Sequence, residues 1–197
     1  MSIAMRSNLL PFLAAVTLAG CRGAPPKPDL APMPDIKVVR SAPAWYLKAP
    51  VDADYVLVPA TATSRDLQVA IDKAQLAARA GIATQMEAKL EVLGKRFSEE
   101  SGASPTSELI QSYSAATKVV VSSVLNGSRP RDQQIVREGD IYRAYVLMEL
   151  PIGRANAELV QRLRVNEQNF TRLRATQAFK ELERDVMRYE AAKAGTP

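Results

Sequence analysis

LQVAIDKAQLAARAGIATQMEAKLEVLGKRF, residues 67–97, decides the fold because its apolar side chains recur at steps of three or four. This spacing keeps one face of an α-helix apolar, so we expect one long helix with that face buried. Ser64 is the expected N-cap, and Asp66 lies in the expected first turn. The expected buried positions are Leu67, Ile71, Ala74, Ala78, Ile82, Met86, Leu90, Leu93 and Phe97.

Short runs of β-favouring residues flank this helix. Upstream, residues 55–58 form a run that we expect Pro59 to stop. Downstream, residues 133–137 and 141–150 are expected strands, joined by a turn at Gly139-Asp140. Alternate residues of the last strand share one face, which we expect to be buried. These residues are Tyr142, Ala144, Val146, Met148 and Leu150.

The segment between the long helix and these strands first favours a helix and then a strand. Residues 105–108 are expected to open a shorter helix that continues through Tyr113. Three β-branched residues at 119–121 then favour a strand, and a loop is expected to continue through Asp132. These elements indicate an α+β fold. A small, mostly antiparallel sheet of three or four strands is covered by a long helix and a shorter one, in two layers.

Residues 152–197 are almost continuously helix-favouring, which predicts a long amphipathic C-terminal helix. Its apolar residues form two stripes that face different directions, so we expect a bend or a change of partner near residues 174–178. The first stripe, expected to pack on the chain's own domain, comprises Leu159, Leu163, Phe170 and Leu173. The second, expected to meet an envelope protein or another copy of the chain, comprises Ala178, Leu182, Val186 and Tyr189.

The N-terminal end carries a targeting signal. Residues 9–18 form an apolar run that is too short to span a bilayer and is typical of a secretory signal. Leu18, Ala19 and Gly20 precede Cys21, and this arrangement resembles the lipobox of bacterial lipoproteins. We therefore expect a signal peptide at residues 1–20 and covalent lipid on Cys21. Two or more acyl chains would anchor the protein stably in a bilayer.

Residues 21–42 are rich in proline and poor in large apolar side chains, which predicts a tether rather than a folded segment. Twenty residues in a polyproline-like conformation reach roughly 60 Å. A proline-rich recognition motif is the alternative interpretation. Folding is expected to begin at Pro43-Ala44-Trp45-Tyr46, with Trp45 as a core anchor.

The composition restricts the possible chemistry. The chain has no histidine and one cysteine, which excludes Ser-His-Asp and Cys-His catalysis, zinc sites with imidazole ligands and a disulfide within the chain. The net charge of +5 is too mild to favour nucleic acid. We expect no catalytic residue, no metal and no cofactor apart from the lipid on Cys21. Carboxylate pairs without the spacing of a calcium loop are Glu87 and Glu91, Asp52 and Asp54, and Glu138 and Asp140.

Three stretches carry a family resemblance: PAW at 43–45, DKAQLAARA at 72–80 and YRAYVL at 142–147. Together they resemble the LPP20 family of bacterial lipoproteins, and a similar domain begins the flagellar assembly protein T. The resemblance covers residues 43–151. It implies an outer-membrane lipoprotein domain without known catalytic residues.

The preferred hypothesis is a non-enzymatic outer-membrane lipoprotein facing the periplasm, which acts as a structural or docking component of the cell envelope, including flagellar or surface structures. Arg22, rather than an aspartate, follows Cys21 and favours the outer membrane. The alternative is a lipid-anchored module that binds a periplasmic ligand or peptidoglycan through Trp45, Tyr46 and Tyr55. A hydrolase without histidine is a third class, which requires carboxylates that converge in a pocket.

Overall fold

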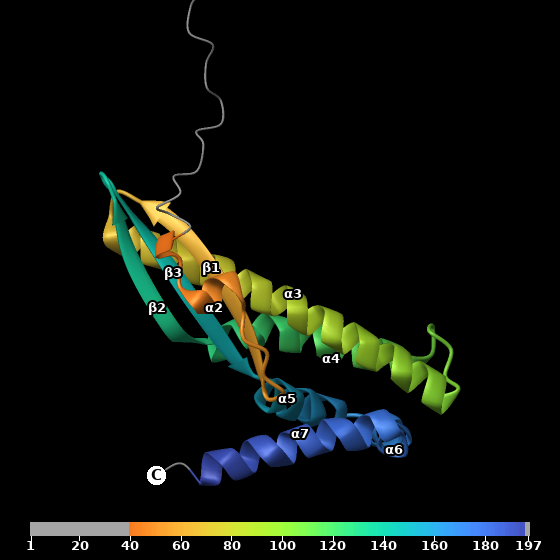
Figure 1. The fold of residues 1–197 in the computed structure, drawn as a ribbon. Helices are drawn as coiled ribbons and strands as arrows, with labels where there is room; N and C mark the ends of the chain where they lie inside the picture. Colours follow the sequence, from red (N-terminus) through yellow and green to blue (C-terminus); the bar gives the residue numbers. More distant parts are fainter. Residues whose placement is uncertain (1–39, 196–197) are drawn as a thin grey trace, which may run out of the picture. The chain divides into compact units, whose positions relative to one another are not determined.

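The computed structural model describes residues 40–195. The predicted signal peptide, the lipobox with Leu18, Ala19, Gly20 and Cys21, and most of the predicted tether lie outside these residues. Figure 1 shows the elements in chain order. They are α2 (Ala44–Leu47), β1 (Tyr55–Ser64), α3 (Leu67–Ser101), α4 (Glu108–Val124), the 3-10 turn η1 (Leu125–Gly127), β2 (Arg129–Glu138), β3 (Ile141–Pro151), α5 (Ile152–Leu163), α6 (Glu167–Arg174) and α7 (Gln177–Ala194).

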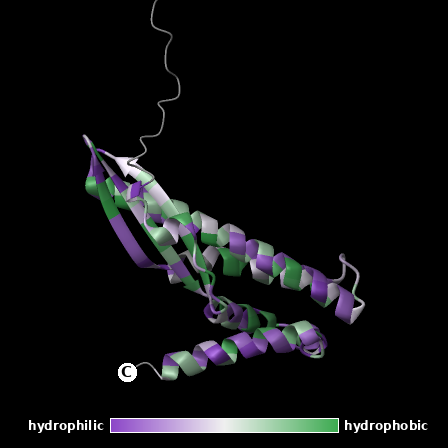
Figure 2. Ribbon diagram, in the orientation of Figure 1, coloured by the Kyte–Doolittle hydropathy of each residue, from purple (hydrophilic) through white to green (hydrophobic). Residues whose placement is uncertain are grey.

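Three antiparallel strands form one sheet in the order β1-β3-β2, so β3 is the central strand. β2 and β3 are joined by the expected turn, in which Gly139 adopts a φ of +59°. This left-handed conformation suits glycine because glycine has no Cβ. β2 starts at Arg129, earlier than expected, and is mostly hydrophilic (Figure 2). The expected α+β class with an antiparallel sheet is confirmed.

β1 does not stop at Pro59 but continues to Ser64, which corrects the shorter expected strand. Pro59 lies opposite Leu147 of β3. β1 is an edge strand, and one side of an edge strand needs no ladder hydrogen bonds, so a proline is tolerated there.

Because β1 is longer than expected, the N-cap residue of α3 also differs from the expected one. Asp66, not Ser64, is the N-cap of α3, because its carboxylate accepts a hydrogen bond from the N–H of Val69 at 2.9 Å. The Ser64 hydroxyl instead accepts a hydrogen bond from the N–H of Asp66 at 3.2 Å. An aspartate in this position satisfies one of the free N–H groups at the helix start.

α3 packs against the sheet and then extends beyond it. A Cβ at Gly81 would lie only 2.7 Å from Cγ1 of Val58, so this glycine allows the helix to approach β1 closely. Leu67 is 40% exposed, which corrects its expected burial, and Ile71 and Leu93 are partly buried. The buried residues of α3 are Ala70, Ala74, Ala78, Ile82, Met86, Leu90, Gly94 and Phe97.

Residues 119–121 belong to α4, so the expected strand at this position is wrong. Val120 is fully buried in the core, whereas Val119 is 42% exposed. Burial of an apolar stripe outweighs the small propensity cost of β-branched residues in a helix. The other buried residues of the α4 stripe, at steps of three or four, are Leu109, Tyr113 and Ala116.

The C-terminal segment is divided into α5, α6 and α7, so the expected single helix over residues 152–197 is wrong. The expected break near residues 174–178 is confirmed, since Thr176 caps α7 by accepting a hydrogen bond from the N–H of Phe179. A second break precedes α6, which Asn166 caps through the N–H of Asn169. The first predicted stripe lies in or against the core as expected, with Leu159, Leu163 and Leu173 buried and Phe170 partly buried.

The second predicted stripe is not free for a partner. Ala178 and Leu182 are 0% and 2% exposed and belong to the core, and Val186 packs against the same core. α7 achieves this burial because the break at Thr176 turns it back along α5 (Figure 1). The prediction that this stripe binds a partner is therefore corrected, since the stripe completes the chain's own core.

Gly153 fixes the crossing of α5 and α7. A Cβ at this position would lie 2.6 Å from the carbonyl oxygen of Asp185 and against the Cβ of Tyr189. Tyr189, the last residue of the second stripe, thus packs on the backbone of α5. A backbone oxygen cannot move aside as a side chain can, so only glycine fits here without separating the two helices.

The opposite face of the sheet is partly covered by α2. The ring of Tyr46 meets the ring of Tyr145 edge-on, with centroids 4.9 Å apart. Trp45 is only half-buried, and α2 has no buried residue, so the expected core anchor is wrong. α3 already fills the core face of the sheet, and a four-residue helix is too short to enclose an indole on the other face.

We expect Leu182→Ala to lower the free energy of unfolding by about 2–5 kcal/mol, because it removes a buried side chain and leaves a cavity. Val165→Ala is the matched control, since Val165 is 89% exposed and should change stability by less than about 0.5 kcal/mol. Urea unfolding of both variants measures the difference. Equal stabilities would show that α7 does not pack as described.

Candidate functional site

In each carboxylate pair singled out in the sequence, at least one member is paired with a cation. Glu91 lies 3.1 Å from Lys95 at an exposed helix position, and Asp52 lies 3.4 Å from Arg131. Glu138 accepts a hydrogen bond from Arg143 at 2.6 Å. Among residues 40–195, no three side chains of the metal-ligating types converge. The Glu91–Lys95 and Asp52–Arg131 pairs are solvent-accessible ion pairs that contribute little stability individually.

The three aromatic residues proposed as a glycan platform are separately engaged. Tyr46 packs on Tyr145, as described above. The guanidinium of Arg131 lies over the ring of Tyr55, 5.8 Å from its centroid. Two of the three rings therefore already have partners within the domain, and all three are only partly exposed.

The arginines of the C-terminal segment surround one aromatic ring. Arg164 and Arg174 lie over Phe170, 5.6 and 5.8 Å from its centroid. Arg162 forms an ion pair with Glu158 at 2.8 Å, within one turn of α5. These three arginines therefore have local partners within the chain.

A mainly apolar groove with a volume of about 560 Å³ lies between α3 and α4. The two helices form a hairpin and lie side by side (Figure 1). Residues line the groove at helical steps on both sides. On α3 they are Glu87, Leu90, Glu91, Gly94, Lys95, Ser98 and Glu99, and on α4 they are Ile110, Tyr113, Ser114, Thr117 and Lys118.

Tyr113 forms the floor of this groove. Its hydroxyl donates a 2.6 Å hydrogen bond to the carbonyl oxygen of Leu90, and its ring meets Phe97 edge-on at 5.2 Å. A Cβ at Gly94 would lie 2.7 Å from the Tyr113 ring, so this glycine lets the ring lie flat against α3. The floor is thus fixed by one glycine and one buried aromatic residue.

Burial raises the pKa of Tyr113 above its ordinary value, because the charged phenolate would lose its hydration. The hydroxyl therefore stays protonated at physiological pH and serves as a hydrogen-bond donor. A nucleophile or general base would need the opposite shift.

The rim of the groove carries both signs of charge. Glu87, Glu91 and Glu99 stand on α3, and Lys95 of the same helix pairs with Glu91. Lys118 is the cation on the α4 side. The α3 edge is therefore acidic overall, around a floor that is mainly apolar.

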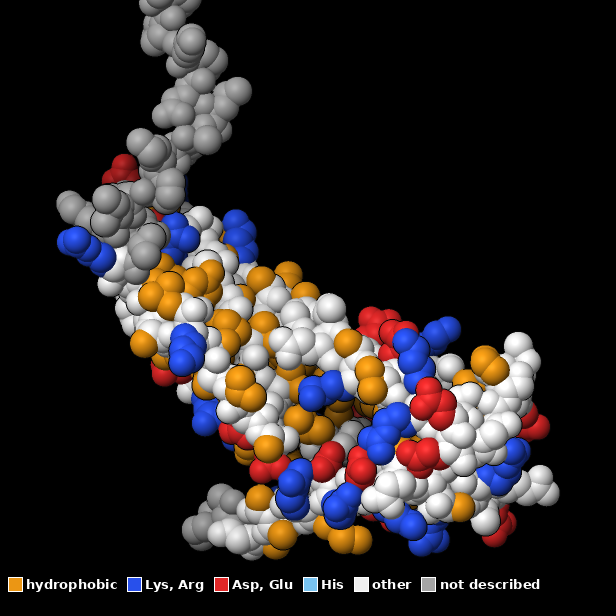
Figure 3. All heavy atoms as spheres, turned by 45° about the vertical axis from the view of Figure 1, so that its right-hand side comes forward, with side chains coloured by type: hydrophobic (Ala, Val, Ile, Leu, Met, Phe, Trp, Pro, Cys, Tyr) orange, Lys and Arg blue, Asp and Glu red, His pale blue; other side chains and the backbone are white. Residues whose placement is uncertain are grey.

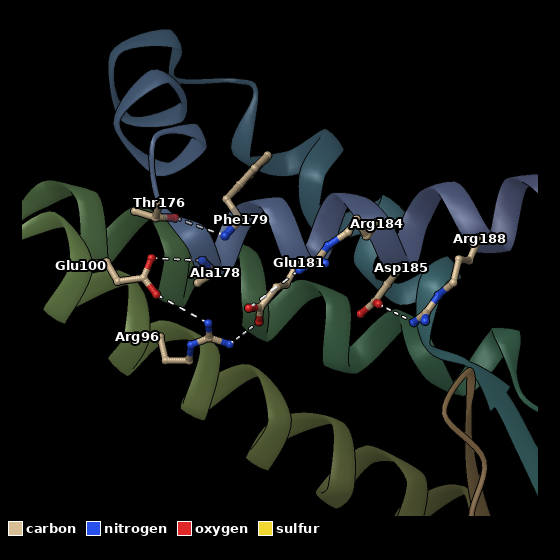
Figure 4. Close-up of polar contacts among 9 residues, drawn as sticks. All are labelled: Arg96, Glu100, Thr176, Ala178, Phe179, Glu181, Arg184, Asp185 and Arg188. Carbon is tan, nitrogen blue, oxygen red and sulfur yellow. Dashed lines mark hydrogen bonds and ion pairs between the residues drawn. The ribbon is translucent and has the colours of Figure 1, made fainter.

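A smaller hollow of about 280 Å³ lies between α3, α5 and α7, and Met86, Leu93 and Leu182 line it. Figure 3 shows hydrophobic side chains exposed on this face of the molecule, with charged side chains gathered toward the helical end. Figure 4 shows the polar contacts that hold α7 beside α3. They serve the packing of α7, which makes this hollow a poorer candidate for binding than the α3–α4 groove.

Arg96 is central to these contacts. Its guanidinium lies 2.6 Å from Glu181 of α7 and 3.6 Å from Glu100 (Figure 4). Glu100 also accepts a hydrogen bond from the N–H of Ala178 at 3.1 Å, which satisfies a free group at the start of α7. The hydrogen bond between Arg96 and Glu181 lowers the pKa of Glu181 and raises that of Arg96.

The groove was not predicted from the sequence. Apolar spacing indicates only the buried face of a helix, whereas the edges of the groove are formed by other residues of α3 and α4. Gly94 was the available signal. It continues the four-residue spacing from Leu90 but brings no side chain, which marks a close contact with another element.

No helix within residues 40–195 combines the length and the apolar character that crossing a bilayer requires. The sequence matches no protein-family model. A comparison with curated proteins likewise gives no match.

Tyr113→Phe should cost about 1 kcal/mol at neutral pH, because the hydrogen bond to Leu90 is lost. The raised pKa of Tyr113 adds stability that is complete below about pH 10, the unfolded-state value, and is lost as the pH rises toward the folded-state value. The difference between the two proteins should therefore narrow above about pH 10. Urea unfolding from pH 8 to pH 11 measures it, and a constant difference would contradict the assignment.

Proposed function

We propose that this protein is a lipid-anchored, non-enzymatic docking component of the bacterial outer membrane, facing the periplasm. The groove between α3 and α4 carries the proposal. It is an open trough with a mainly apolar floor, and its one group with a shifted pKa, Tyr113, is held in the protonated form. Such a trough offers contact area for another polypeptide rather than converging groups for chemistry.

The occupant of the groove is an amphipathic helix of another envelope protein. Helix-in-groove recognition uses anchors at steps of three or four, which match the steps of the lining residues on both helices. The acidic α3 edge, with Glu87 and Glu99, is complementary to lysine or arginine beside the partner's apolar stripe. Lys118 favours an acidic residue on the other flank.

The attachment to the membrane rests on the N-terminal signal. Leu18, Ala19 and Gly20 before Cys21 support lipidation of that cysteine, and Arg22 supports sorting to the outer membrane. The resemblance of residues 43–151 to LPP20 lipoproteins supports the same location. An anchored docking domain of this kind serves the assembly of surface structures, including flagella.

Cys21→Ser should release the protein from the membrane fraction, because it removes the only site for covalent lipid. The measurement is fractionation of cells in high salt, followed by immunodetection of the chain. Ser41→Ala, which leaves the lipobox intact, is the control and should stay with the membranes. Retention of the Cys21→Ser protein would refute the anchor.

A photo-reactive amino acid at Ser114, an exposed position of the groove, should form one discrete adduct with an envelope protein in living cells. The same probe at Thr84, an exposed residue of α3 outside the groove, should give none. The adduct should also disappear in the Cys21→Ser background, since docking takes place at the membrane.

Equal adducts at Ser114 and Thr84 would show that the groove is not a specific docking surface. Binding of the purified chain to cell-wall sacculi, with no protein adduct, would favour the peptidoglycan-binding alternative instead.

A further inference from the structure

An exposed, mainly apolar strip comprises residues 44–51. It includes α2, which lies on the face of the sheet opposite α3, and the chain that leads from α2 toward β1. Leu47 is 61% exposed and Val51 is 99% exposed. Trp45, the only tryptophan of the chain, is half-buried in the same strip. Lys48 is its only charged residue, and the domain leaves Leu47 and Val51 uncovered.

The surroundings of the strip favour an anionic, partly apolar surface. Arg40 and Lys48 are exposed cations at its start and middle. The two acidic residues that follow are offset by arginines, since Asp52 lies 3.4 Å from Arg131, and Asp54 lies 3.3 Å from Arg188. Tryptophan together with leucine, valine and lysine is the composition of segments that lie at the boundary between lipid headgroups and acyl chains.

The position of the strip in the chain indicates that it contacts the lipid bilayer. The described residues begin at Arg40, and the proposed anchor, Cys21, precedes them by fewer than twenty residues. A chain held this close to a bilayer meets the lipid surface at high effective concentration, so even weak contacts are populated. A partner protein would need to be supplied, whereas the bilayer is always within reach.

We infer that residues 44–51 are a second membrane-contacting element, which inserts Trp45, Leu47 and Val51 shallowly into a bilayer that contains anionic lipid. The inference rests on the proposed lipid anchor for its geometry. The strip holds the domain on the membrane surface. The chain between Cys21 and Arg40 then sets only the largest possible distance between the domain and the bilayer. Insertion of aromatic and aliphatic side chains adds to the acyl chains as an independent attachment.

The test uses residues 21–197 with Cys21 coupled to a maleimide lipid in vesicles of phosphatidylethanolamine and phosphatidylglycerol. Cys21 is the only cysteine, so the coupling is specific, and it does not depend on lipidation in cells. Trp45 is the only tryptophan, so its emission reports the strip alone. We expect a blue shift on coupling and quenching by lipids brominated on their acyl chains.

The double variant Leu47→Asp and Val51→Asp should lose this quenching, because charged side chains oppose insertion. Without coupling, its binding to the same vesicles should be weaker by about tenfold or more. Leu76→Asp is the matched control, since Leu76 is 68% exposed on α3, and it should behave as the unmodified chain. All three residues are exposed, so thermal melting should be unchanged.

Unquenched emission from the coupled, unmodified chain would overturn the inference, as would equal quenching in the double variant. Loss of quenching in Leu76→Asp would also overturn it, since a different face would then meet the lipid. Because the anchor is supplied chemically, these failures are distinct from failure of the Cys21→Ser experiment, which tests the proposed anchor in cells.

Discussion

The burial of α3 along its whole length holds both halves of this domain together. Its buried residues recur at every fourth position from Ala70 to Gly94. An α-helix has 3.6 residues per turn, so each step of four moves the buried position about 40° around the axis. The buried line therefore winds around the helix. Near Gly81 it faces the sheet at Val58, and near Gly94 it faces α4 at Tyr113. One helix thus serves as the common core of a sheet layer and a helical layer.

The winding line explains why the C-terminal helices are needed. Where α3 and α4 extend past the sheet, the apolar residues of α3 have no strand to cover them. α7 supplies Phe179 and Leu182, which are 0% and 2% exposed, and Arg96 of α3 binds Glu181 on the same helix. The groove on the other side of the hairpin has Tyr113 as its floor, because Gly94 leaves room for that ring against α3.

The sequence predicted those parts of the fold in which local preference and burial agree. The long helix, the hairpin turn at Gly139, the strand over residues 141–150 and the break before α7 were all readable from spacing and turn residues. Val120 was misread because a buried partner outweighs its β preference. The stripe that contains Ala178 and Leu182 was correctly identified as apolar, but spacing within a helix does not say whether its partner is the same chain.

The candidate sites were harder to predict for a related reason. Gly94 continues the spacing of the buried residues of α3 but has no side chain, so it is a weaker signal than the large apolar residues around it. Trp45 was expected inside because large aromatic residues usually are, yet the face that would enclose it is already occupied by Tyr46 on Tyr145. Whether Trp45 is buried depends on which surfaces of the sheet the long helix leaves uncovered, and the sequence alone does not show which surfaces these are.

The two proposed surfaces are compatible in one molecule because they are formed by different elements, residues 44–51 on the one hand and α3 with α4 on the other. Residues 44–47 lie on the face of β3 that presents Tyr145, whereas α3 covers the opposite face through Val146 and its neighbours. A domain that rests on lipid through residues 44–51 therefore presents its helical layer away from the bilayer. The groove between α3 and α4 belongs to that layer, so the proposed membrane contact would leave it accessible. In the proposed function, a partner helix would dock without competing with lipid, and the proposed anchor would restrict docking to proteins close to the membrane surface.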